Sequence, residues 1–413
     1  MNNRIGNLFK GDKVIWMVFF FLCMISIVEV FSASSGLTYK SQNYVGPIAY
    51  HTFTIFLGVL AVIATLNVPC RYFKLLTPFL LLISGLMLLI VMLGGGESTN
   101  DASRWIRLGP FTIQPSEIAK GTIVLTVAQI LAAMQRENGA DRKAFKYILW
   151  FTIPACLAIG VENLSTAALL FGVVFLMMFI GLVPMRQLGK LLAIIAFLGI
   201  FAISTVMIVG HDRSEEDESQ QLTKTELLEK SKKKSKLEKM LHRADTWKSR
   251  ILKFGKPKPT PKEYDLDKDA QVAHANIAIV SSGIVGKGPG KSTERDFLAQ
   301  AFSDFIFAIV IEELGIIGAA FVVFLYIILL YRCARIASRC ENNFPAFLAM
   351  GLGLLLVVQA TFNMMVAVGL APVTGQPLPL ISKGGTSTII NCAYIGAILS
   401  VSRSAKMKSE VKM

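Results

Sequence analysis

Charged residues are scarce in this chain. Asp, Glu, Lys and Arg make up 17% of its 413 residues, whereas hydrophobic residues make up 53%. Soluble domains usually contain about 25% charged residues, so this composition excludes an ordinary soluble protein. The sequence therefore predicts an all-α polytopic membrane protein, in which long apolar helices cross the bilayer.

Cysteine is also scarce, and its placement excludes a disulfide-rich secreted domain. No cysteine lies in the long polar segment of the chain, and no Cys or His spacing typical of a metal site is visible. The six cysteines all lie in or beside apolar runs: Cys23, Cys70, Cys156, Cys333, Cys340 and Cys392.

Acidic residues are outnumbered, with 28 Asp and Glu against 42 Lys and Arg, which gives a net charge of +14. Such a surplus can indicate nucleic-acid binding. Here, however, most basic residues fall in short connections between apolar runs, as the positive-inside rule requires of cytoplasmic loops. We therefore expect a membrane as partner and no nucleic acid.

Apolar runs of spanning length recur along the whole chain. They predict ten transmembrane helices in a single membrane domain, residues 1–413, with both termini in the cytoplasm. The first run is longer than the core of a signal peptide, so we expect a retained span. The runs are 14–31, 52–69, 74–93, 115–134, 146–161, 165–184, 190–210, 304–331, 344–368 and 387–402.

One long polar segment, 211–303, interrupts this pattern before the eighth predicted helix. We expect it to be an extracytoplasmic loop. Its first part, 211–262, is rich in Lys, Glu, Ser and Pro and cannot bury enough apolar surface to fold by itself. We expect 211–262 to be partly disordered or to form a charged amphipathic helix.

A single acid, Asp304, stands where this polar loop meets the eighth apolar run. Ionisable residues at membrane depth are costly, so an acid kept there indicates a functional site. The alternative is that Asp304 is the N-cap or first-turn acid of the next helix, where it would offset the helix dipole. The residues alone do not choose between these two interpretations.

Other polar residues predicted on the outer side accompany Asp304. Glu117 and Lys120 are three residues apart on one helix face, either as a structural ion pair or as the lining of a polar cavity. Arg104 suits a position at the water interface. Glu162 lies in a short polar turn that is either a simple connection or part of the same cavity as Asp304.

The segment 286–292, G-K-G-P-G-K-S, resembles a nucleotide phosphate loop but is one residue short and follows no strand. We reject nucleotide binding. Its glycines, with Lys287 and Lys291, suit a cradle for a lipid-linked phosphate. Glu312 lies eight residues after Asp304, about 12 Å deeper on a straight helix, so we expect Glu312 and Glu313 to have a structural role.

The segment 369–385 is rich in proline and glycine and includes Lys383. Irregular backbone at membrane depth survives only where it is buried in protein or lines a cavity. We therefore predict a re-entrant stretch.

Together these motifs resemble the SEDS family, whose members include FtsW, RodA and SpoVE. The resemblance spans nearly the whole chain and is closest to the division branch, FtsW, of the Bacteroidetes type. The motifs that carry it are F-S-A-S at 31–34, R-W-I-x-L-G-x-F-x-I-Q-P-S-E-I-x-K at 104–120, G-I-V-G-K-G-P-G-K-S at 283–292, S-D-F-I-F-A-I-V-I-E-E-L-G at 303–315 and P-V-T-G-Q-P-L-P-L-I-S-K-G-G at 372–385.

The resemblance implies a peptidoglycan glycosyltransferase of the bacterial inner membrane, working at the division septum. Its substrate would be lipid II, polymerised into β-1,4-linked strands, and its partners a class B penicillin-binding protein and other divisome membrane proteins. Asp304 would be the catalytic base. A divalent cation, Mg²⁺ or Mn²⁺, is compatible with the reaction, but no cofactor is implied with certainty. The substrate-binding residues would be Arg104, Glu117, Lys120, Glu162, Lys287, Lys291 and Lys383.

The chain departs from the family pattern around its acid. The family usually has L-P-E-A-H-T-D where residues 298–304 read L-A-Q-A-F-S-D, so an acid and a histidine are missing. Glu162 and Asn163 also replace the usual proline and aspartate. Two other functions stay open, a lipid II flippase and a non-catalytic division scaffold.

Overall fold

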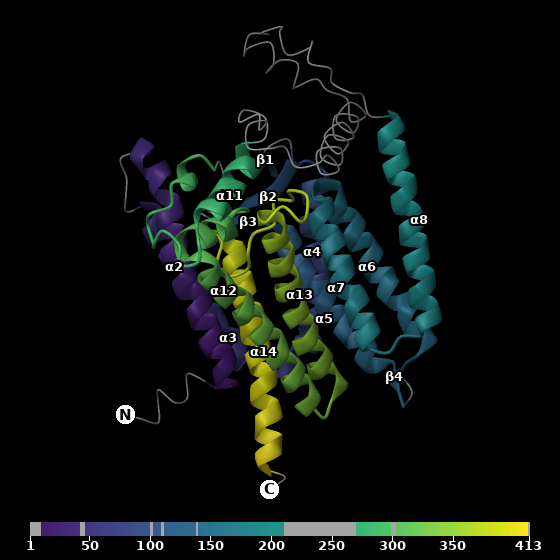
Figure 1. The fold of residues 1–413 in the computed structure, drawn as a ribbon. Helices are drawn as coiled ribbons and strands as arrows, with labels where there is room; N and C mark the ends of the chain where they lie inside the picture. The colour runs from purple at the N-terminus through teal and green to yellow at the C-terminus, as the bar shows by residue number, and fades with distance from the viewer. Residues whose placement is uncertain are drawn as a thin grey trace. The chain divides into compact units, whose positions relative to one another are not determined.

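The computed structural model describes residues 10–41, 46–99, 102–108, 111–137, 139–209, 270–298 and 303–411. Nearly all of these residues are helical (Figure 1). The long helices are α2 (Lys13–Ser41), α3 (Gly46–Asn67), α4 (Cys70–Met92), α5 (Pro115–Ala133), α6 (Arg142–Glu162), α7 (Leu164–Ile180), α8 (Met185–Val209), α12 (Ile306–Arg339), α13 (Asn343–Ala367) and α14 (Thr386–Val411).

Each of the ten predicted apolar runs coincides with one of these helices. Among the described residues, seven helices are long and apolar enough to cross a membrane. The predicted all-α multi-pass architecture is therefore confirmed. Ten as the number of crossings stays a prediction, since α7 has 17 residues and α8 and α14 are not among the seven.

Helix α5 forms the centre of the main bundle. It packs against α13, α4, α6 and α7, and 72% of its most apolar stretch is buried, against 22% for α4 and α6. The exposed apolar side chains of those outer helices suit contact with lipid.

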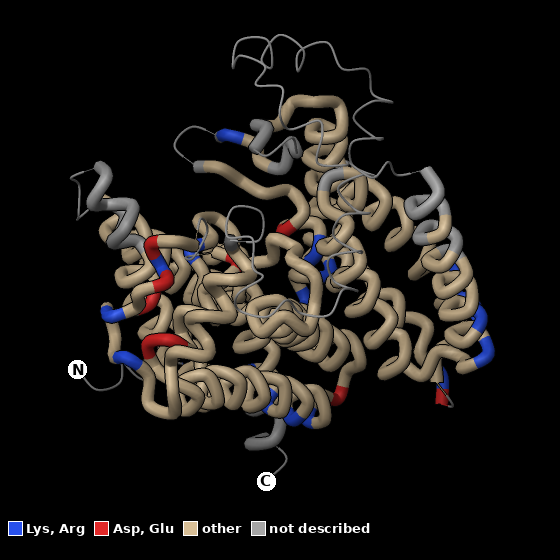
Figure 2. Tube along the Cα trace, turned by 45° about the horizontal axis from the view of Figure 1, so that its top comes forward, with Lys and Arg blue, Asp and Glu red and all other residues tan. Residues whose placement is uncertain are grey.

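Figure 2 shows Lys and Arg near the C-terminal end of the chain, while long stretches of helix carry neither sign of charge.

Short strands lie in the connection between α4 and α5. Strands β1 (Glu97–Thr99), β2 (Ala102–Leu108) and β3 (Phe111–Ile113) form an antiparallel sheet in the order β1-β2-β3. Leu108 faces Phe111 in its register. A two-residue pair, β4 (Gln135–Arg136) and β5 (Gly139–Ala140), joins α5 to α6. These strands are additions to the predicted all-α fold.

Helix α12 is interrupted at Gly315, whose φ of 70° and ψ of −172° are not helical. The segment that follows α11 (Ala270–Ser281) meets α12 at this break. A Cβ atom added to Gly315 would lie 2.3 Å from the carbonyl oxygen of Ile284, so glycine is required by close backbone approach as well as by its positive φ. The short 3₁₀ helix η2 (Glu294–Asp296) follows this segment.

The chain divides into two compact units. One contains the elements above except α8; the other consists of 186–264 and 371–373, and its described part includes α8 from Arg186 onward. The single membrane domain over 1–413 stays a prediction. The predicted disordered or amphipathic segment 211–262 lies outside the described residues.

Candidate functional site

Asp304 lies in the turn that leads into α12, and its side chain is partly exposed. Ser303 donates a hydrogen bond of 3.0 Å to the Asp304 carboxylate. The N-cap residue of α12 is Phe305, which makes no side-chain cap hydrogen bond, and the first turn of α12 contains no acid. The interpretation of Asp304 as the N-cap or first-turn acid is therefore wrong.

The main chain of Asp304 is fixed by α13. Asn363 Nδ2 donates 2.9 Å to the carbonyl oxygen of Asp304 and 2.7 Å to that of Gln376. Ser382 Oγ donates 2.7 Å to the carbonyl of Ser303. Together these three bonds connect the turn at Asp304 to the proline- and glycine-rich segment before α14, directly through Ser382 and indirectly through Asn363.

That segment is held by buried side chains from several helices, as the predicted re-entrant stretch requires. Its carbonyl groups would otherwise be unpaired in an apolar interior, which is costly. Four side chains donate to these carbonyls: Asn363 to that of Gln376, Gln359 to that of Pro377 at 3.1 Å, Tyr326 to that of Pro379, and Ser26 to that of Ile381 at 2.7 Å.

The polar turn between α6 and α7 joins the same network. Gln376 Nε2 donates 2.6 Å to Thr166 Oγ1, and Asn163 caps α7 by accepting 3.2 Å from the Thr166 amide. Through Gln376 and Asn363 this turn is connected by hydrogen bonds to the main chain of Asp304. A cavity shared by the turn and Asp304 stays a prediction. Glu162 is the last residue of α6, and its side chain lies outside the described part.

Glu117 and Lys120 form the predicted ion pair, with Lys120 Nζ 2.8 Å from Glu117 Oε1. Both side chains are buried, and Lys120 also donates 2.7 Å to Gln359 Oε1. The sequence analysis did not identify Gln359 as the third member. Because Gln359 in turn holds the Pro377 carbonyl, the pair supports the re-entrant stretch from inside the bundle.

The glycine-rich segment docks onto α12 through Glu312. Lys287 Nζ lies 2.6 Å from Glu312 Oε1, and the Thr293 amide donates 3.0 Å to the same oxygen. Ser292 Oγ donates to the other oxygen of Glu312. The structural role predicted for Glu312 is confirmed. Its partners belong to the glycine-rich segment before α12 and not to a neighbouring helix.

Glu313 accepts hydrogen bonds from two further amides of this segment. The amides of Gly290 and Ser292 donate 2.9 and 3.2 Å to its carboxylate. In this structure the amides of Gly290, Ser292 and Thr293 bind these two carboxylates, and those of Lys287 and Gly288 bind main-chain carbonyls of α12. The expected phosphate cradle stays a prediction, for which these amides would have to exchange partners. Ser32 of α2 also donates to Glu313 and accepts 2.9 Å from Arg295.

The contributions of Ser26, Ser32 and Arg295 were missed by sequence analysis. A signal exists for α2, where Ser26, Glu29 and Ser32 recur at intervals of three and so share one helix face. All three are buried.

The remaining predicted cations differ in their surroundings. Lys383 is partly buried in the irregular stretch before α14. Lys291 is exposed. Arg104 lies in β2, and its side chain is outside the described part.

The described residues contain no group of three or more His, Cys, Asp or Glu that could hold a metal ion. Asp304 supplies one carboxylate. Mg²⁺ is commonly bound by one or two carboxylates together with substrate phosphates, so a divalent cation would need ligands from the substrate here. The cation stays a prediction.

Comparison with known proteins identifies the family to which the whole chain is similar. A family model described as "Cell cycle protein", FTSW_RODA_SPOVE, matches residues 12–407. The probable peptidoglycan glycosyltransferase FtsW of Geobacter metallireducens is 30% identical over 402 residues, 96% of each chain. Peptidoglycan glycosyltransferase MrdB of Escherichia coli is 27% identical over 401 residues, 97% of this chain and 95% of the relative.

Solved structures share the fold. A chain from a peptidoglycan synthase complex that coordinates polymerization and crosslinking gives a TM-score of 0.68 at 23% identity, covering 95% of this chain and 98% of that one. RodA of Thermus thermophilus gives 0.62 at 22% identity, covering 96% and 98%. The chain therefore belongs to the FtsW/RodA/SpoVE family and is, by homology, a multi-pass membrane peptidoglycan glycosyltransferase.

Proposed function

We propose that this chain polymerises lipid II into β-1,4-linked glycan strands on the outer face of the membrane, with Asp304 as general base. The observation that carries the proposal is the placement of Asp304. Asp304 is partly exposed and precedes the N-cap residue of α12, while its main chain is bonded to Asn363 and its neighbour Ser303 to Ser382. A base needs this combination of access and fixed position.

The reaction is a single inverting displacement. The acceptor 4-hydroxyl oxygen forms a bond to the anomeric carbon of the donor sugar, and its proton passes to the Asp304 carboxylate. The bond from that carbon to the lipid pyrophosphate breaks, and the electron pair leaves with the pyrophosphate. An α-linked donor then gives a β-linked product, so one carboxylate and no covalent intermediate suffice.

Positive charge must meet the departing pyrophosphate. Lys383 is the best placed of the candidates, because the adjacent Ser382 is bonded to the turn that contains Asp304. Arg104 and Lys291 are further candidates for this role, and Glu162, the last residue of α6, is a further candidate for contact with substrate. Lys287 would have to exchange Glu312 for substrate, so we assign Lys287 to docking of the loop.

The buried pair Glu117 and Lys120 has an indirect role in this proposal. Lys120 is fully buried and bonded to Glu117 and Gln359, so it positions the re-entrant stretch rather than touching substrate.

The test is polymerisation of labelled lipid II by the purified protein, with and without its cognate class B penicillin-binding protein. Asp304→Ala should abolish the glycan ladder. Asp296→Ala is a matched control, because Asp296 is an exposed acid in the segment just before Asp304. Polymerisation by Asp304→Ala at the wild-type rate overturns the assignment.

We further propose that the enzyme works at the septum, as an FtsW-type protein with a class B penicillin-binding protein and other divisome proteins. The motif likeness to FtsW supports the septal role, and the likeness in fold to a chain of a peptidoglycan synthase complex supports only the expectation of a partner protein. Part of the motif likeness to FtsW comes from Arg243, Trp247 and Arg250 in the segment 211–303, and these three residues lie outside the described part of the chain. Depletion should give filaments with blocked septa; rounded cells would indicate an elongation role.

A further inference from the structure

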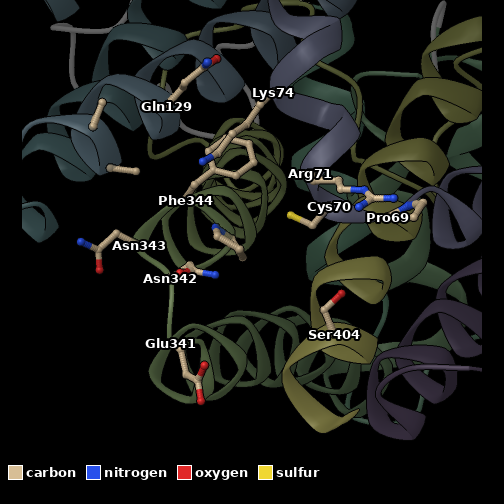
Figure 3. Close-up of a pocket in the computed structure, with 13 residues that line it drawn as sticks. Pro69, Cys70, Arg71, Lys74, Gln129, Glu341, Asn342, Asn343, Phe344 and Ser404 are labelled. Carbon is tan, nitrogen blue, oxygen red and sulfur yellow. The ribbon is translucent and has the colours of Figure 1, made fainter. Parts of the chain in front are cut away.

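A cavity of about 790 Å³, lined by both polar and apolar side chains, lies far from Asp304 (Figure 3). Asn343, the first residue of α13, lines it, whereas Asn363 of the same helix holds Asp304. Twenty residues of helix separate the two positions, about 30 Å along the axis. The lining residues are Pro69, Cys70, Arg71, Lys74, Gln129, Ala132, Ala133, Glu341, Asn342, Asn343, Phe344, Pro345 and Ser404.

Two cations line this cavity. Lys74 Nζ lies 5.0 Å from the ring centroid of Phe344, and Arg71 stacks on Tyr72 at 4.9 Å. Figure 3 shows Lys74 beside Phe344 and Arg71 beside Pro69. In the described part of the chain neither cation forms a salt bridge, and Glu341 is the one acid of the lining. The cavity therefore favours an anion.

Two helix N-termini reinforce this preference. Helix α4 starts at Cys70 and α13 at Asn343, and no side chain caps either helix. Their N-cap residues, Pro69 and Asn342, both line the cavity. Helix N-termini carry partial positive charge and unpaired N–H groups, which suit phosphate oxygens.

The adjoining surface of α4 is apolar. Leu75, Leu76 and Phe79, within the next two turns after Lys74, are 64%, 43% and 66% exposed. Side chains of this kind suit acyl chains. A ligand that combines a phosphate with acyl chains therefore matches both the cavity and the helix surface beside it, as basic pockets between membrane helices match anionic lipid headgroups.

We infer that this cavity binds the phosphate headgroup of an anionic phospholipid, with Arg71 and Lys74 as its cationic ligands. The N-termini of α4 and α13 contribute N–H donors, and the lipid's acyl chains lie along α4. This site belongs to the end of the bundle where the sequence predicts cytoplasmic loops. The inference does not depend on the function proposed for Asp304.

The experiment measures lipid retention by the purified full-length protein in native mass spectrometry. Phosphatidylglycerol and phosphatidylcholine with identical acyl chains are titrated separately, and inorganic phosphate is titrated as a third probe. We expect phosphatidylglycerol to bind best. Arg71→Gln with Lys74→Gln should weaken it about 30-fold, since each cation near a membrane surface contributes about a factor of five.

The control variant is Lys143→Gln with Arg335→Gln, which removes two exposed cations outside the cavity lining. It should retain phosphatidylglycerol as the wild type does. Arg71→Lys with Lys74→Arg keeps both charges and should retain most binding, which separates loss of the site from misfolding. The inference is overturned if both lipids bind equally, if the control variant loses as much, or if inorganic phosphate displaces the lipid.

Discussion

Asn363 donates a hydrogen bond of 2.9 Å to the main-chain carbonyl of Asp304, although 59 residues separate them in the chain. The same amide donates 2.7 Å to the carbonyl of Gln376. One buried side chain of α13 thus sets the spacing between the proposed base and the re-entrant stretch. The geometry of the site depends on a residue that performs no chemistry.

Asn363→Leu should lower polymerisation about 10- to 100-fold, because a displacement of about 1 Å at a reacting group can cost a factor of a hundred. It also leaves two buried carbonyls without their donor, at about 1–3 kcal/mol each. Rate per folded molecule and thermal unfolding are both measured. Thr361→Ala is the control, since Thr361 bonds only the preceding turn of its own helix in the described structure. A normal rate in a destabilised Asn363→Leu protein would contradict a positioning role.

Lys120→Met should destabilise the protein strongly, by about 3–5 kcal/mol, because it leaves the buried carboxylate of Glu117 uncompensated. Combining it with Glu117→Gln should restore much of that loss. Thermal unfolding in detergent measures both. Arg136→Met provides the comparison, since its side chain is 74% exposed in its pair with Asp141 and should cost under about 1 kcal/mol. If Lys120→Met alone and Lys120→Met combined with Glu117→Gln lowered the unfolding temperature equally, Glu117 and Lys120 would not be energetically coupled.

Gly286→Ala should release the loop from α12. Gly286 has a φ of +85°, and an added Cβ would lie 2.3 Å from the carbonyl oxygen of Glu313. Gly290 has a φ of +80° but nothing within 4 Å of such an atom, so Gly290→Ala isolates the backbone strain alone. Hydrogen exchange over 283–293 should rise much more for Gly286→Ala. Similar exchange in the two variants would exclude the close approach as the cause.

The stability contribution of Asp141 should depend on pH. The Lys143 amide bonded to its carboxylate, with Arg136 nearby, lowers the pKa of Asp141 below its ordinary value of 3.8. The folded state thus binds this proton less readily than the unfolded state, so stabilisation is present above pH 3.8 and is lost as pH falls through the lowered value. Asp141→Ala should lower Tm at neutral pH, and the difference from wild type should shrink in acid. A difference independent of pH would contradict this assignment.

Local features of the fold could be predicted from the sequence. The ten apolar runs coincide with helices because the length and hydropathy that favour a membrane helix are properties of a single continuous segment. The Glu117 and Lys120 pair follows from a spacing of three residues on one helix. The irregular stretch around Lys383 follows from its proline and glycine content.

Contacts between distant segments could not be predicted in this way. Gln359 joins Lys120 across 239 residues, and no periodicity relates the two positions. The glycine-rich segment reads as a phosphate cradle, yet its amides bind Glu312 and Glu313 because α12 breaks at Gly315 and lets the loop approach. The sequence singled out Asp304 but left two interpretations of its role open. The N-cap position of α12 is Phe305, which excludes the interpretation of Asp304 as the N-cap residue.

The most direct measurement of the central claim is the steady-state rate of lipid II polymerisation by Asp304→Asn, beside Asp296→Asn. The amide keeps the shape of the carboxylate but cannot accept the acceptor proton. We expect Asp304→Asn to lose about 10²- to 10⁴-fold in kcat, the usual contribution of a general base, and Asp296→Asn to stay near wild type. An Asp304→Asn enzyme that polymerises lipid II as fast as wild type would contradict the account.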